Sequence, residues 1–236
     1  MIAGNIKKLR ELIEKKAVES KRDPSEIKLI AVSKNFGKDE IISAFKEGIV
    51  NFGENKAQEL VSKYEELDTL NEKIIWHFIG ILQRNKARFA VRTSEYIHSV
   101  DSLLLAAEID KQAGKLNKIQ KVLLEVNTSG EESKSGLTEE SELKDLLKYC
   151  TELPNVEPVG LMTIAPYTDN KEIIKNSFNY LRELKNELNA EGYNLTELSM
   201  GMTNDFEVAI EEGATMLRIG TAIFGERNYS KTGTDK

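Results

Sequence analysis

The sequence predicts a single (β/α)8 barrel, and three observations indicate this fold class. Eight short apolar stretches with the composition of strands alternate with amphipathic stretches of helical period. The 236 residues, 40% of them hydrophobic, suit the size of one such barrel. No long linker or fixed-period repeat interrupts the alternation. Strictly alternating strands and helices form right-handed parallel crossovers, so eight units can close without an exposed edge; an open doubly wound sheet is the alternative.

The elements follow from the apolar pattern. An opening amphipathic helix, about residues 2–21, has its apolar residues on one side, and a turn at Asp23-Pro24 leads into the first apolar run. Strands are expected at 27–33, 50–54, 74–79, 96–100, 121–126, 158–164, 197–200 and 216–219. The helices between them are expected at 38–48, 56–67, 86–91, 102–113, 139–150, 171–190 and 205–212. One domain should cover residues 1–229, followed by a flexible tail at 230–236.

Composition argues against several functions. A formal net charge of -6 gives no reason to expect nucleic acid binding, which needs a concentrated basic face. The single cysteine, Cys150, excludes an intrachain disulfide and suits a reducing cytoplasm. Two histidines are too few and too far apart for a usual zinc site. The amino terminus turns charged almost at once, so we expect neither a signal peptide nor a membrane span, and a cytoplasmic protein.

Unusual residues gather where the predicted strands end. In a (β/α) barrel the chemistry lies at the carboxyl ends of the strands, so polar residues and glycines there are candidates for a site. In chain order these are Lys34, Gly53-Glu54-Asn55, His77 to Gly80, Ser99 and Asp101, Asn127, Met162-Thr163, Ser199 to Asn204, and Gly220-Thr221.

The last two strand ends have the character of a phosphate site, because the loops after strands seven and eight often hold phosphate in this fold. Ser199 and Thr221 supply hydroxyl donors, and Gly201 and Gly220 let backbone N–H groups approach an anion. A helix beginning near Asp205 would add its positive end. The alternative is that both glycines merely allow tight turns between strand and helix.

Arg218 is expected to point into the barrel. On strand eight, Leu217 and Ile219 share the face toward the outer helices, so alternation turns Arg218 inward. An unpaired guanidinium is costly there, and an acceptor must meet it. An ion pair with Glu125, which could also face inward, and a bound ligand are the two alternatives.

Lys34 gains its interest from its position. A lysine at a strand end is usually just solvated, but this one lies opposite the predicted phosphate site, where an amine can attack a carbonyl. A ligand that binds through a phosphate at one end and forms an imine with a lysine at the other end is an aldehyde phosphate. His77 could donate to the ring of such a ligand or be a core histidine. Asn55 could serve the site or cap the following helix.

An ordered set of motifs between about residues 27 and 225 resembles the YggS/PROSC family of pyridoxal phosphate homeostasis proteins. The motifs are Ala31-Val32-Ser33-Lys34, Phe52-Gly53-Glu54-Asn55, Trp76-His77-Phe78-Ile79-Gly80, Leu82-Gln83-Arg84-Asn85-Lys86, Val100-Asp101-Ser102, Lys134-Ser135-Gly136, Gly160-Leu161-Met162, Ser199-Met200-Gly201-Met202 and Arg218-Ile219-Gly220-Thr221.

The resemblance implies a barrel of the alanine racemase N-terminal-domain type, fold type III among pyridoxal phosphate proteins, and a monomer or weak dimer. It implies that Lys34 holds pyridoxal 5′-phosphate as a Schiff base. The other implied cofactor-binding residues are Ser199, Gly201, Gly220 and Thr221 on the phosphate, Arg218 near the pyridine nitrogen, Asn55 and His77 beside the ring, and Met162 and Met200 within the matching motifs. Asn35-Phe36-Gly37 departs from the many relatives that have proline after the lysine.

A carrier of the cofactor is the expected function. An arginine beside the pyridine nitrogen disfavours its protonation and makes the ring a poor electron sink. Racemisation also needs a second acid or base, which a further domain supplies in alanine racemases; after residue 219 too few residues remain for one. We therefore expect buffering and delivery of the cofactor without turnover, with transient contacts to apoenzymes. A small racemase-type enzyme is the alternative, and a phosphosugar lyase using a Schiff base is a more distant one.

Overall fold

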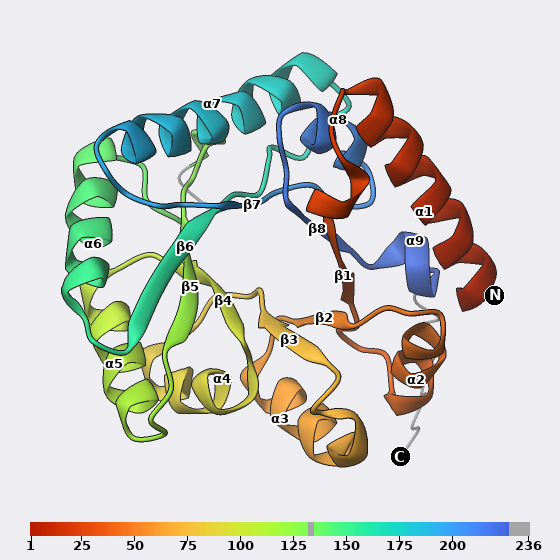
Figure 1. The fold of residues 1–236 in the computed structure, drawn as a ribbon, viewed down its shortest axis with the longest axis horizontal. Helices are drawn as coiled ribbons and strands as arrows, with labels where there is room; N and C mark the ends of the chain where they lie inside the picture. Colours follow the sequence, from red (N-terminus) through yellow and green to blue (C-terminus); the bar gives the residue numbers. More distant parts are fainter. Residues whose placement is uncertain (132–134, 227–236) are drawn as a thin grey trace, which may run out of the picture.

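The computed structural model describes residues 1–131 and 135–226. Within these residues, eight parallel strands follow one another in chain order and close into a barrel (Figure 1). Closure is made by the pairing of the first and last strands, in which Lys28 lies beside Met216 and Ala31 beside Ile219. The predicted fold class is confirmed, and the open sheet is excluded. The predicted tail, residues 230–236, lies outside the described residues.

The strands agree with the predicted ones to within a few residues: β1 (Lys28–Val32), β2 (Asn51–Glu54), β3 (Ile75–Phe78), β4 (Tyr96–Val100), β5 (Gln120–Glu125), β6 (Val156–Met162), β7 (Glu197–Ser199) and β8 (Met216–Ile219). The helices are α1 (Ile2–Glu19), α2 (Lys38–Lys46), α3 (Ala57–Glu66), α4 (Ala87–Thr93), α5 (Leu103–Gly114), α6 (Glu140–Glu152), α7 (Lys171–Ala190), α8 (Phe206–Glu211) and α9 (Thr221–Phe224). The short helix α9 and three 3₁₀ helices, at Pro24–Glu26, Asp68–Leu70 and Arg84–Lys86, were not predicted.

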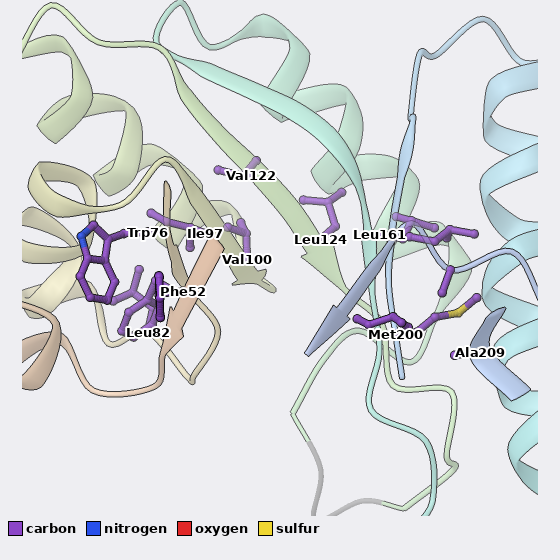
Figure 2. Close-up of a cluster of buried hydrophobic side chains, with 14 of the residues drawn as sticks. Phe52, Trp76, Leu82, Ile97, Val100, Val122, Leu124, Leu161, Met200 and Ala209 are labelled. Carbon is purple, nitrogen blue, oxygen red and sulfur yellow. The ribbon is translucent and has the colours of Figure 1, made fainter. Parts of the chain in front are cut away.

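The main core lies between the barrel and the surrounding helices. Figure 2 shows strand side chains such as Phe52, Trp76 and Leu124 directed toward this layer, and all three are buried. Burying one side chain of this size contributes roughly 1.5–3 kcal/mol. A second, smaller cluster consists of Ile30, Leu123, Val159, Met162 and Met216. The barrel interior is therefore only partly apolar, and polar residues fill the rest.

The opening helix α1 packs beside α2, α8 and α9 (Figure 1). Its buried residues, Ile6, Leu9, Ile13 and Ala17, recur at the helical period, as the sequence predicted for this stretch. The side-chain amide of Asn5 donates to the carbonyl of Ile223 at 3.0 Å, which ties α1 to α9. The helix thus supports the segment that follows β8. Among the described helices, none is both long and apolar enough to cross a membrane.

Candidate functional site at the carboxyl ends of the strands

Lys34 lies in the turn that directly follows β1, and its side chain is half-buried. In the described part of the chain, no residue forms a hydrogen bond or an ion pair with its amine. The next residue, Asn35, has a positive φ of 66°, a conformation that asparagine tolerates better than most residues. A sharp turn thus holds an amine without a partner at the end of the strand.

A buried ion cluster lies under this turn. The Lys63 amine donates at 2.7 Å to the Ser33 carbonyl, to Glu54 Oε1 and to Glu59 Oε1. The Ser33 hydroxyl also donates to Glu54 at 2.6 Å, and the backbone N–H of Asn35 donates to Glu59 at 2.5 Å. Burial raises the pKa of the Glu54 carboxyl from 4.5 to about 6, although Lys63 opposes this shift. The cluster therefore binds both residues that flank Lys34.

Asn55 does not cap the following helix. The N-cap position of α3 is Lys56, and no side chain caps this helix end. The half-buried Asn55 amide forms no hydrogen bond with the described residues. Gly80 packs closely against the Asn55 backbone, because a Cβ added at Gly80 would lie 2.3 Å from the Asn55 carbonyl oxygen. The amide is thus available to a ligand, which supports the site alternative over the capping alternative.

The two glycines of the predicted phosphate loops differ in kind. Gly201 has a φ of +95°, and an added Cβ would lie 2.6 Å from the Cβ of Ala209. Turn geometry and packing therefore require glycine at 201. Gly220 has no positive φ, and the nearest atom to an added Cβ would be the Val32 carbonyl oxygen at 3.4 Å, an ordinary contact. Protein packing therefore does not require glycine at 220, where a Cβ would fit in ordinary contact with Val32.

The loops after β7 and β8 meet through Thr203, which belongs to the candidate run from Ser199 to Asn204 but was given no role of its own. Its hydroxyl accepts a long hydrogen bond, 3.4 Å, from the backbone N–H of Ala222, the neighbour of the exposed Thr221. Asp205 lies just before α8, and its carboxylate accepts a hydrogen bond from the Met202 N–H at 2.5 Å. The expected positive end of this helix is therefore accompanied by a carboxylate, and α8 has only 6 residues. The carboxylate therefore weakens the contribution that the sequence predicted for this helix end.

Arg218 points into the barrel, as alternation predicted, and is buried. Its guanidinium donates to the Ser199 hydroxyl at 2.7 Å and to the Thr163 carbonyl at 2.9 Å. Of the two alternatives for Arg218, the ion pair with Glu125 is not formed among the described residues: Glu125 instead accepts from the Ser135 hydroxyl at 2.6 Å. Burial lowers the pKa of Arg218 to about 10, while Asp205 and Glu125 oppose the shift at longer range. Lys134, which precedes Ser135 in its motif, lies outside the described residues.

His77 has the surroundings of a core histidine. It is fully buried, and its ring stacks on Tyr96 with centroids 4.8 Å apart. Nδ1 lies 2.9 Å from Nε2 of His98, and Nε2 lies 3.0 Å from Oδ1 of Asn51. The other nitrogen of His98 lies 2.8 Å from the Ser199 hydroxyl. Both nitrogens of His77 therefore have protein partners, and its connection to the carboxyl-end site runs through His98 and Ser199.

The two predicted methionines lie on opposite sides of the strands. Met162 belongs to the small cluster that includes Ile30 and Met216. Met200 packs in the outer core, and Figure 2 shows it beside Ala209 of α8. The preceding residue, Ser199, faces the barrel interior, where it contacts Arg218. Because neighbouring residues along a strand face opposite sides, the Met200 side chain turns away from the interior. Only its backbone is positioned to contribute to the site.

Comparison with known proteins agrees with this geometry. The chain matches the family described as alanine racemase, N-terminal domain, over residues 2–228. The solved structure of PipY from Synechococcus elongatus with pyridoxal phosphate bound has a TM-score of 0.84 and 37% identity, covering 95% of this chain and 100% of that chain. The same protein without the cofactor has a TM-score of 0.86 and 38% identity. Fold and site thus define a barrel of the alanine racemase N-terminal-domain class.

Relatives that match over nearly the whole chain show which family within this class the chain belongs to. The pyridoxal phosphate homeostasis protein of Aquifex aeolicus is 47% identical over 226 residues, which is 95% of this chain and 97% of that protein. The chain therefore belongs to the family of pyridoxal phosphate homeostasis proteins, as the motifs predicted. An alanine racemase from Streptomyces coelicolor has a TM-score of 0.73 at 15% identity, and the match covers 96% of this chain and 58% of the racemase chain. At this low identity the likeness shows the fold alone.

Proposed function

We propose that this chain binds pyridoxal 5′-phosphate through Lys34 and serves in the homeostasis of this cofactor. The observation that carries the proposal is the amine of Lys34, which has no partner among the described residues and is held at the carboxyl end of β1 by the buried cluster around Lys63. The name of the relatives and the cofactor bound by PipY support it. When bound, pyridoxal phosphate supplies an aldehyde that forms a reversible carbon–nitrogen double bond with an amine, releasing water.

The residues at the strand ends fit such a ligand. Thr221 and the backbone at Gly220 would receive the phosphate, together with Thr203. Asn55 supplies a free amide beside the ring, and the Arg218 guanidinium would face the ring nitrogen. The remaining predicted residues contribute less directly: Gly201 shapes the loop, Met162 packs inside the barrel, Met200 contributes its backbone, and Ser199 and His77 have partners inside the protein.

We infer that the chain holds and releases the cofactor and does not turn over amino acids. A positive charge at the ring nitrogen opposes its protonation, and a racemase would also need a second acid or base on the far face of a substrate. The name given to the relatives agrees with a role in homeostasis. We further propose a cytoplasmic location, a single folding unit over residues 1–229, a monomer or weak dimer, and transient delivery of the cofactor to apoenzymes.

The test is reductive labelling. Purified protein should be yellow, and after borohydride treatment peptide mass spectrometry should find the phosphopyridoxyl group on Lys34. Lys34→Ala should abolish both the colour and the label. Lys38→Ala is the matched control, because Lys38 is an exposed lysine at the start of α2 and its loss should change neither. A colourless wild-type protein without the adduct would refute the proposal.

The enzyme alternative has its own test. The loaded protein is incubated with a panel of amino acids in deuterated water, and exchange at Cα is followed by NMR. We expect no exchange above that of free pyridoxal phosphate. Exchange that is fast, stereospecific and lost in Lys34→Ala would replace the carrier by a racemase-type enzyme.

A further inference from the structure

A continuous chain of hydrogen bonds crosses the barrel interior. At one end, a guanidinium has donors and no acceptor, so Arg218 donates to the Ser199 oxygen, 2.7 Å away. Nδ1 of His98 lies 2.8 Å from the same hydroxyl, which can either donate to it or accept from it. The other end of the chain decides between these two directions.

At the other end, Oδ1 of Asn51 can only accept, so His77 has a hydrogen on Nε2 and donates to it at 3.0 Å. A neutral His77 then accepts at Nδ1 from Nε2 of His98, 2.9 Å away, and a neutral His98 in turn accepts at Nδ1 from the Ser199 hydroxyl. Both histidines are fully buried and lie edge to face, with ring centroids 5.1 Å apart. With both rings neutral, all four hydrogen bonds are satisfied when both are protonated on Nε2.

The charges around the chain favour the same state. Burial, with the nearby charge of Lys28 on β1 acting in the same direction, lowers the pKa of His77 to about 3. Burial also holds the pKa of His98 well below 6.5, with His77 and Arg218 acting in the same direction. Asp205, before α8, and Glu125, on β5, are the carboxylates that act on Arg218, and neither is hydrogen-bonded to it. A fixed cation at one end and neutral rings behind it follow from this arrangement.

We propose that Ser199, His98 and His77 are positioning residues that fix the Arg218 guanidinium at the carboxyl end of the barrel, and that Ser199 serves this role in place of binding the cofactor phosphate. The Ser199 hydroxyl gives its only hydrogen to His98 and its oxygen to Arg218, so no hydrogen is left for a phosphate oxygen. This inference rests on the proposed function, because it concerns the group that would face the ring nitrogen.

The chain itself is tested in the protein without cofactor. Nitrogen-15 NMR of the imidazoles should show both histidines as neutral Nε2–H tautomers from pH 5 to 8. A positively charged ring, or a ring protonated on Nδ1, in this range would overturn the chain. This readout does not depend on pyridoxal phosphate, so it stays decisive even if the cofactor proposal fails.

The role of Ser199 is tested with loaded protein. We expect Ser199→Ala to raise the pH midpoint of the cofactor absorption change by about one unit, since a guanidinium that has lost a hydrogen bond opposes ring protonation less well. Its preference for pyridoxal phosphate over pyridoxal should stay unchanged. Thr203→Val is the comparison variant and should reduce this preference about tenfold without moving the midpoint. The opposite pattern, in which Ser199→Ala loses phosphate preference and keeps its midpoint, would overturn the proposal.

A pair of His98 variants separates positioning from simple packing. Asn at 98 keeps an oxygen near the place of Nδ1 for the Ser199 hydroxyl, whereas Leu does not. The midpoint should therefore shift in His98→Leu and return toward the wild-type value in His98→Asn. Equal midpoints in the two variants would refute a role through Ser199. If His98→Leu does not fold, the Ser199→Ala result decides alone.

Discussion

Replacing Lys63 by methionine should destabilise the protein in a pH-dependent way. Lys63 is 5% exposed and donates to Glu54, to Glu59 and to the Ser33 carbonyl. Methionine has a similar length but no charge. In Lys63→Met the fully buried Glu54 keeps only the hydroxyl of Ser33, because its second oxygen, Oε2, already lacks a hydrogen-bond partner among the described residues.

The magnitude follows from the uncompensated carboxylate. Breaking a buried ion pair by removing one partner costs about 3–5 kcal/mol, and we expect this loss at pH 8. The pKa of Glu54 in the folded protein, about 6, already exceeds its ordinary value of 4.5, so the folded state takes up a proton before the unfolded state as pH falls. A difference of 1.5 units corresponds to about 2 kcal/mol in favour of folding once the pH is below 4.5. Without Lys63 this pKa rises further.

Urea unfolding of wild type and Lys63→Met at pH 8 and pH 5 measures both effects. The loss of stability in the variant should be smaller at pH 5 than at pH 8, because the pKa of Glu54 rises further without Lys63 and protonated Glu54 no longer needs a cation. Arg92→Met is the matched control: its ion pair with Glu65, at 2.6 Å, is exposed, so its removal should cost only about 0.2–1 kcal/mol. The reasoning fails if Lys63→Met costs no more than the control, or costs the same at both pH values.

Three further predictions concern the core, the glycines and the histidines. Phe52→Ala should cost about 3–5 kcal/mol in urea unfolding, since Phe52 is fully buried; a loss below about 1 kcal/mol would contradict its place in the core. Gly201→Ala should lose more than about 1 kcal/mol of stability, whereas Gly220→Ala should stay within about 0.5 kcal/mol and instead weaken pyridoxal phosphate binding by fluorescence titration; equal stability losses would refute the distinction. The pKa of His77 is about 3 in the folded protein and 6.5 ordinarily, so the unfolded chain takes up this proton first as the pH falls. The contribution of His77 to stability should therefore decrease by about 2 kcal/mol between pH 6.5 and pH 5. His77→Gln, which can still donate to its neighbour, should lack this part of the pH dependence, and an unchanged slope would argue against a neutral buried His77.

Most of the fold was predictable because it depends on periodicity. The buried residues of α7, among them Ile174, Phe178 and Leu181, recur every three or four positions, and Asn170 caps this helix by accepting from Glu172 at 3.0 Å. The pattern gives no such signal for α9, which has only four residues and is held in place by its contacts with α1. Short elements that depend on tertiary contacts cannot be predicted from the periodicity of apolar residues.

The site was predictable where position along a strand decides the role. Lys34 follows β1 in the sequence and does so in the structure, and alternation alone turned Arg218 inward. The partner of Arg218 could not be found this way: the sequence suggested Glu125 or a ligand, and only the barrel places the Ser199 hydroxyl 2.7 Å from the guanidinium. Lys63 gave one usable signal, its spacing of four residues from Glu59, but nothing local indicated that Glu54 would complete the cluster.

The different surroundings of Ser199 and Thr203 show why a motif does not assign roles to its hydroxyls. Both lie in the same short segment after β7, and both are donors of the kind that a phosphate needs. Ser199 is the last residue of the strand and is fully buried, so its hydroxyl is used by Arg218 and His98. Thr203 lies four residues further along, where the chain has left the barrel wall and approaches Ala222 beyond β8. Under the proposed function, the hydroxyl that serves the phosphate is therefore that of Thr203, although the motif draws attention to Ser199.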